Sequence, residues 1–120
     1  MPPIFDHLGS LRRMGDDQQL FDEMVGFLRD DGPARLEEIH SGLSDLNYER
    51  MNQSTHSLKG LISNFGATRA VLAAIKLESL IKQRKSAADL EPAFADFQTA
   101  VEELQEALAP FRARAGSSVR

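Results

Sequence analysis

Seven large apolar residues in the last third of the chain alternate spacings of four and three residues without a miss. Residues three and four apart lie on the same face of an α-helix, so this stretch predicts one helix with a continuous apolar seam. Such a seam must be buried against other helices. We interpret it as the core side of a helix bundle rather than as a coiled-coil dimer seam, because it is needed to complete the bundle. The seven residues are Leu90, Phe94, Phe97, Val101, Leu104, Leu108 and Phe111.

The rest of the chain repeats helical spacing in shorter stretches and has no alternating apolar run typical of a strand. A short first helix on Ile4, Leu8 and Leu11 stops near Gly15. A second helix opens at Asp16 and Asp17, carries Leu20, Met24, Phe27 and Leu28, and breaks or kinks at Gly32-Pro33. The stripe continues on Leu36, Ile39, Leu43 and Leu46. A fourth helix runs from about Asn47, as N-cap, to Asn64, with Gly66 left-handed behind it. Thr68 caps a fifth helix, which carries Leu72, Ile75 and Leu80 and fades at "KQRKSA".

Short connections between long helices predict antiparallel neighbours. We therefore expect an all-α fold: an antiparallel four-helix bundle with a short additional N-terminal helix. In a chain of 120 residues this is one domain, at residues 1–112, with a loose C-terminal tail at 113–120. The starting methionine favours a free-standing protein.

Composition argues against several classes of function. The formal net charge is −4 and the pI is near 5.3, which disfavours a nucleic-acid binder. The chain has no cysteine, so it has no disulfide or thiolate metal site. It shows neither a membrane-spanning run nor a signal peptide, and we expect it in the cytoplasm. Acidic pairs at 16–17 and 30–31 have the character of helix-end charges rather than metal ligands.

His56 is the candidate functional residue. At about 100° per residue, it lies about 140° from the centre of the apolar stripe of its helix, on the solvent side. Asn52, Lys59 and Ser63 share its flank, and Gly60 lies one turn further along. His7 and His40 have no such surroundings, and we assign them structural roles.

Gly60 and Lys59 indicate the kind of chemistry that this surface supports. Glycine inside a helix costs about 0.5–1 kcal/mol relative to alanine, a penalty that makes sense if another molecule must approach the backbone beside His56. A lysine one turn away suits an imidazole that will carry an anion, and histidine can act as a nucleophile through its unprotonated nitrogen.

At these residues the sequence resembles the histidine-containing phosphotransfer (HPt) domain family. The family pattern of histidine, one residue, leucine, lysine and glycine reads here His56-Ser57-Leu58-Lys59-Gly60, followed by "LISNF" and Gly66-Ala67. The resemblance extends over roughly residues 5–111. Thr55 stands where the family frequently has alanine before the histidine. Three further residues are bulkier than is usual in the family: Leu61, Ile62 and Phe65.

The resemblance implies a helical bundle in which His56 accepts a phosphoryl group from a receiver-domain aspartate and passes it to another receiver. Lys59 would steady the phosphoryl charge, and Gly60 would let the receiver approach. Asn52 and Ser63 are further candidates for phosphoryl stabilisation or partner binding. Leu58 would belong to the core, Gly66 would close the helix, and Leu61 could alter partner choice.

The expected partners are receiver domains of response regulators, with a hybrid histidine kinase as one candidate source of such a domain. We expect a monomer that binds neither nucleic acid nor membrane. It would be a carrier rather than an enzyme, with no cofactor of its own, and Mg²⁺ would be supplied by the receiver. The alternative is a helical adaptor that binds and inhibits a receiver or histidine kinase without being phosphorylated. A third possibility is an enzyme with its own kinase or phosphatase activity, but the sequence contains no acid, metal or nucleotide motif that supports one.

Overall fold

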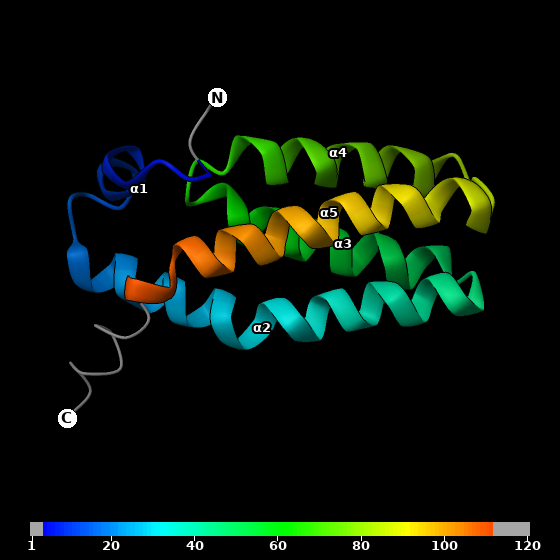
Figure 1. Ribbon diagram of the computed structural model, residues 1–120, viewed down its shortest axis with the longest axis horizontal. Helices are drawn as coiled ribbons and strands as arrows, with labels where there is room; N and C mark the ends of the chain where they lie inside the picture. Colours follow the sequence, from blue (N-terminus) through cyan, green and yellow to red (C-terminus); the bar gives the residue numbers. More distant parts are fainter. Residues whose placement is uncertain (1–3, 112–120) are drawn as a thin grey trace.

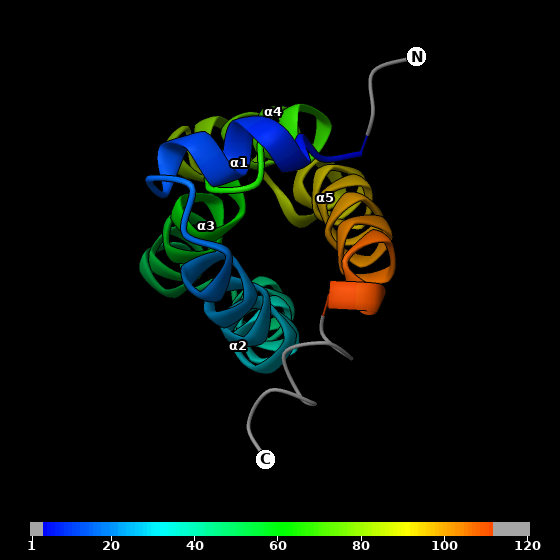
Figure 2. The same ribbon diagram turned by 90° about the vertical axis from the view of Figure 1, so that its left-hand side faces the viewer.

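The protein is an antiparallel bundle of helices. The computed structural model describes residues 4–111, which contain no strand. Figure 1 shows the long helices running alternately in opposite directions, and Figure 2, a view along the bundle, shows a short helix lying across one end. This confirms the all-α four-helix bundle with a short additional N-terminal helix. The helices are α1 (His7–Arg13), α2 (Gln18–Asp45), α3 (Tyr48–Ser63), α4 (Thr68–Lys82) and α5 (Ala87–Ala107).

Side-chain caps fix where two of the long helices begin. The Asp17 carboxylate accepts a hydrogen bond from the backbone N–H of Leu20 at 3.0 Å, and the Asn47 side chain accepts from the N–H of Arg50 at 3.1 Å. Each bond satisfies a backbone donor that has no partner inside the helix, which is worth about 1 kcal/mol. The predicted N-cap at Asn47 is confirmed. Thr68 is not a cap, because it is the first residue of α4, and Ala67 at the N-cap position makes no side-chain bond.

The sequence predicts that the helix breaks or kinks at Gly32-Pro33. Helix α2 passes through this step without a break, so the first of these alternatives is wrong. Proline lacks an N–H and crowds the carbonyl one turn earlier, which normally weakens a helix. Here α5 supports the affected turn, since the Gln105 amide donates to the carbonyl of Leu28 at 3.1 Å. Gly32 leaves room for that side chain: a Cβ at this position would lie 2.5 Å from Gln105 Nε2.

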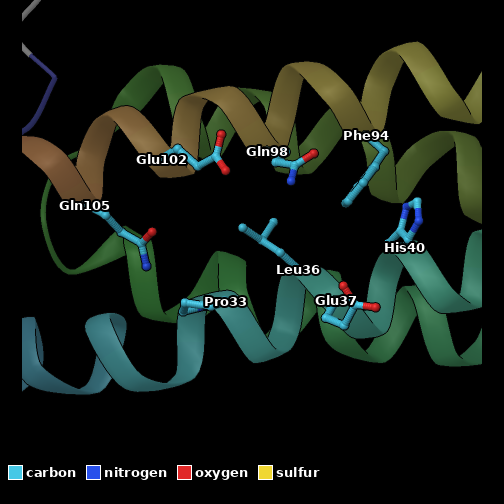
Figure 3. Close-up of a pocket in the computed structure, with 8 residues that line it drawn as sticks. All are labelled: Pro33, Leu36, Glu37, His40, Phe94, Gln98, Glu102 and Gln105. Carbon is cyan, nitrogen blue, oxygen red and sulfur yellow. The ribbon is translucent and has the colours of Figure 1, made fainter.

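An open groove separates α2 from α5 on this side of the bundle. Figure 3 shows Gln105 extending from α5 towards Pro33 on α2, with Leu36 between the two helices. The groove is lined by Pro33, Leu36, Glu37, His40, Phe94, Gln98, Glu102 and Gln105.

The apolar seam of the last helix is confirmed as core, because its residues from Leu90 to Leu108 are buried and Phe111 packs against the core. On α4, however, Leu72 and Ile75 are 60% and 48% exposed. The buried face of α4 is made largely of alanines, whose small side chains give the weaker hydropathy signal but fit close helix packing. The buried apolar residues of α4 are Ala70, Ala73, Ala74, Leu77 and Ile81.

Helix α1 is attached to the turn that follows α3. The backbone N–H of Asp6, at the start of α1, donates to the carbonyl of Phe65 at 2.8 Å. Gly66 has the predicted left-handed conformation, with φ of 62°, and a Cβ there would lie 2.8 Å from that of Asp6. Glycine at this position therefore permits both the backbone conformation and the close approach of α1.

Two predictions concern parts of the chain beyond these helices. The domain boundary at residue 112 and the tail at 113–120 lie outside the described residues.

Within residues 4–111, none of the helices is both long enough and apolar enough to cross a lipid bilayer.

Candidate functional site

His56 stands on the outer face of α3. The opposite face of this helix holds Met51, Leu58 and Ile62, which are at most 1% exposed, so the core fixes the rotation of the helix. The His56 side chain is 70% exposed. The predicted solvent-facing position is confirmed, but the imidazole is not free: its Nδ1 lies 3.0 Å from Oε2 of Glu78 on α4.

Glu78 is the residue that links the site together, and it was not predicted from the sequence. Its side chain is only 7% exposed. One carboxylate oxygen faces His56, and the other accepts a hydrogen bond from Lys59 Nζ at 2.5 Å. A single buried carboxylate on α4 therefore holds the side chains of both His56 and Lys59.

The charge state of Glu78 follows from two opposing effects. Burial raises the pKa of this carboxyl and is the largest single effect. The hydrogen bonds and positive charges of Lys59 and His56 act in the other direction and together outweigh burial, so the pKa lies below its ordinary value. The carboxylate is therefore ionised at neutral pH and can only accept hydrogen bonds.

An ionised carboxylate at Nδ1 determines the form of the imidazole. Because Glu78 can only accept, the neutral His56 ring places its proton on Nδ1 and donates it to Oε2. The lone pair then belongs to Nε2, the other ring nitrogen. The arrangement leaves the ring with an available nucleophilic nitrogen and a fixed hydrogen-bonded one.

Lys59 is less exposed than its position on the helical wheel indicates. Its side chain is 26% exposed because it extends towards α4 and pairs with Glu78. An ammonium group has three N–H donors, so one bond to Glu78 leaves others for a second anion. Lys59 can thus contact a group bound at His56 while it stays anchored.

Gly60 leaves an open space one turn beyond His56. It is exposed, and a Cβ built on it would have no atom within 4 Å beyond its own helix and its neighbours in the chain. The absence of a side chain is therefore not required by packing within residues 4–111. It removes bulk from the surface beside the imidazole.

The two remaining candidates are placed differently. Ser63 donates its hydroxyl proton to the carbonyl of Lys59 at 2.7 Å, so this donor is used within α3. Asn52 lies one turn before His56, and its Oδ1 is buried with no hydrogen-bond partner among the described residues. Of the predicted group, the structure thus brings His56 and Lys59 together through Glu78, and leaves Asn52 and Ser63 on the flank.

The other histidines have aromatic surroundings. His7 packs against Phe21 and Phe111 with ring centroids 4.9 and 4.8 Å away, and His40 lies 6.0 Å from Phe94. Within residues 4–111 there is no cluster of three or more histidine, aspartate or glutamate side chains able to hold a metal ion.

Comparison with known proteins agrees with this geometry. The family model described as "Hpt domain" matches residues 23–107 of the 120-residue chain and includes all of α3 and α4. No curated protein and no solved structure shows significant similarity to the chain. The matched segment contains His56, Lys59, Gly60 and Glu78, and its bundle architecture is the one described above. The chain belongs to the Hpt domain family.

Proposed function

We propose that this protein is a phosphorelay carrier, which holds a phosphoryl group on His56 between the aspartates of two receiver domains. Membership of the Hpt family implies a phosphotransfer role in two-component signalling. The observation that carries the finer proposal is the contact of His56 Nδ1 with the ionised Glu78, because it leaves Nε2 as the nucleophile on an exposed face.

The proposed transfer begins with the Nε2 lone pair of His56, which attacks the phosphorus of an aspartyl phosphate. The bond from phosphorus to the aspartate oxygen breaks, the aspartate leaves as a carboxylate, and an N–P bond forms. The ring keeps its proton on Nδ1, so it gains positive charge, which the buried Glu78 carboxylate stabilises. Attack by an aspartate of a second receiver reverses these steps.

Lys59 supports the same transfer from the other side of Glu78. Its free N–H donors lie one helical turn from His56 and can bind phosphoryl oxygens. Glu78 holds the ammonium in place, so less side-chain freedom is lost when the phosphoryl group arrives.

On this proposal the protein provides neither ATP nor metal, and Mg²⁺ is supplied by the receiver. The protein acts as a cytoplasmic monomer whose partners are receiver domains. Gly60 leaves room for the receiver backbone beside the imidazole.

The test is incubation with a panel of phosphorylated receiver domains, followed by detection of acid-labile phosphate on the protein. We expect label on the wild type, none on His56→Gln, and undiminished label on the matched control His40→Gln, since His40 is also exposed. Label that persists in His56→Gln would contradict the assignment. A wild type that binds receivers but never becomes labelled would favour the inhibitory adaptor instead.

A further inference from the structure

His56 lies on the outer face that α3 and α4 form together, here called the α3–α4 face. Towards the turn that joins α4 to α5, a cavity of about 300 Å³ lies between the two helices, lined by Tyr48, Glu49, Asn52, Ile81, Lys82 and Arg84. Asn52 lies four residues before His56, and Lys82 lies four residues after Glu78. At a rise of 1.5 Å per residue, the near edge of the cavity thus lies about 6 Å along the helices from His56.

Positive charge is concentrated at this end. Lys82, Arg84 and Lys85 fall within four consecutive positions of a chain whose net charge is −4. All three are exposed, and none forms an ion pair with another residue in the described part of the chain. Glu49 is the one carboxylate that lines the cavity. We call Lys82, Arg84 and Lys85 the basic end of the α3–α4 face.

The basic end has a fixed backbone. The Tyr48 hydroxyl donates to the carbonyl of Lys85 at 2.9 Å, and the Arg84 guanidinium lies 5.1 Å from the centre of the Tyr48 ring. Arg84 also has a left-handed backbone, with φ of 53°. A turn held in this way fixes the points at which the three side chains leave the backbone, so no backbone ordering is required when a partner binds.

The opposite end of the α3–α4 face is apolar. Ile75 of α4 is exposed, and Val71, one turn earlier on the same side of α4, lines a second cavity together with Ser63. His56 thus lies between an apolar end and a basic end. A partner that brings a reacting atom to Nε2 covers both, and the difference between them distinguishes the two possible directions of docking.

From this asymmetry we infer that the basic end sets the orientation and choice of the receiver: the matching receiver carries carboxylates where it covers Lys82, Arg84 and Lys85, and apolar side chains where it covers Val71 and Ile75. This inference rests on the proposed function, because it takes a receiver to be the molecule that docks at His56. Charge complementarity selects an acidic protein surface as the occupant.

The test compares Lys82→Glu with Lys76→Glu, using the receiver that phosphorylates the wild type fastest. Both lysines are exposed residues of α4 and both substitutions change the charge equally, but Lys76 is two residues from Glu78 and so lies on the other side of α4 from the α3–α4 face. We expect Lys82→Glu to slow transfer at low salt by about tenfold, through slower association, and Lys76→Glu by less than about twofold. In roughly 0.5 M NaCl the difference should largely disappear, because screening then acts within a few ångströms.

Phosphoramidate, a small phosphodonor that needs no docking surface, separates the inference from the proposed function. We expect it to phosphorylate the wild type and both variants at equal rates. A wild type labelled by neither donor overturns the proposed function. Equal receiver rates for Lys82→Glu and Lys76→Glu, with labelling of the wild type intact, overturn only the inference. The alternative occupant of the basic end is a lipid surface. If Lys82→Glu loses binding to anionic lipid vesicles but keeps the same receiver rate as Lys76→Glu, the basic end contacts lipid and the inference is overturned. Lys85→Glu repeats the test in the turn itself, and thermal melting verifies that each variant is folded.

Discussion

Glu78 Oε2 lies 3.0 Å from His56 Nδ1, so a buried side chain of α4 holds the ring of an exposed side chain of α3. The contact relates two elements that are joined only by a short turn, and it gives the imidazole a defined tautomer. The same carboxylate reaches Lys59, so the three side chains respond together to substitution.

Removal of the Glu78 carboxylate should therefore weaken phosphoryl acceptance. A hydrogen bond to a charged group is worth roughly 1.5–3 kcal/mol, which corresponds to about a 10- to 100-fold loss of rate in Glu78→Ala. Glu78→Gln keeps a neutral acceptor and should lose less. Nitrogen NMR shifts of His56 provide the structural readout: the Nδ1–H tautomer should dominate in the wild type and be mixed with the Nε2–H tautomer in Glu78→Ala. An unchanged tautomer would contradict the role of Glu78.

The free energy of unfolding should depend on pH through the Glu78 carboxyl. Its pKa is lowered in the folded protein from the ordinary value of 4.5, so the ionised form contributes stability above that pH. This contribution is lost as the pH falls through the folded-state value. Urea unfolding should therefore show the wild type more stable than Glu78→Gln at pH 7, with a gap that narrows below pH 4.5. The exposed Glu37→Gln control should show no comparable gap at either pH.

Substitution of Lys59 should have two effects. Lys59→Ala should slow transfer by about tenfold without abolishing it, because the nucleophile remains and the ammonium is partly screened by water. It should also lower the free energy of unfolding by about 1–3 kcal/mol, since Glu78 stays buried with one partner fewer. Lys76→Ala is the matched control. A loss of transfer as complete as in His56→Gln would show that Lys59 is essential for phosphoryl transfer, which would contradict its supporting role.

Gly60→Leu should separate stability from docking. Leucine should raise the free energy of unfolding by roughly 0.5–1 kcal/mol through helix propensity, and the space at this position admits the side chain. Transfer from a phosphorylated receiver should be blocked, whereas labelling by phosphoramidate should be hindered much less. A more stable variant with an undiminished receiver rate would remove Gly60 from the docking surface.

Thr55 offers a stabilising substitution next to His56. It is fully buried, and its hydroxyl oxygen has no hydrogen-bond partner among the described residues. Thr55→Val keeps the shape and removes the unsatisfied hydroxyl, so the free energy of unfolding should rise by about 1 kcal/mol. Thermal melting measures this, and acceptance by His56 should be unchanged. Destabilisation would indicate that the hydroxyl is satisfied after all.

The sequence predicts most of the bundle because large apolar residues on α5 and a good N-cap at Asn47 are strong local signals. It places α4 correctly but from the wrong side chains, since alanines form the buried face there and the larger Leu72 and Ile75 are exposed. It also allows a helix break at Gly32-Pro33, where α2 continues and Gln105, more than seventy residues away in the chain, supports the turn. Such compensation is a tertiary effect that local patterns do not contain.

In the candidate site, too, local sequence predicts some features and tertiary packing decides the others. The exposure of His56 follows from the periodicity of α3 alone, whereas its contact with Glu78 depends on how α3 and α4 face each other. One local signal was present: Glu78 continues the spacing of Ala70, Ala74, Leu77 and Ile81, which puts a carboxylate on a buried face. A charge in that position requires a partner, and the helix next to it offers Lys59.

The bond from Asp6 to the carbonyl of Phe65 has a practical consequence for the design of shortened fragments. The matched family segment starts at residue 23, beyond α1, so a fragment trimmed to it would leave that carbonyl without its donor and uncover the turn at Gly66. The last turn of α3 would then fray more easily, close to Lys59 and Gly60. A fragment intended to report on His56 chemistry should therefore begin before Asp6.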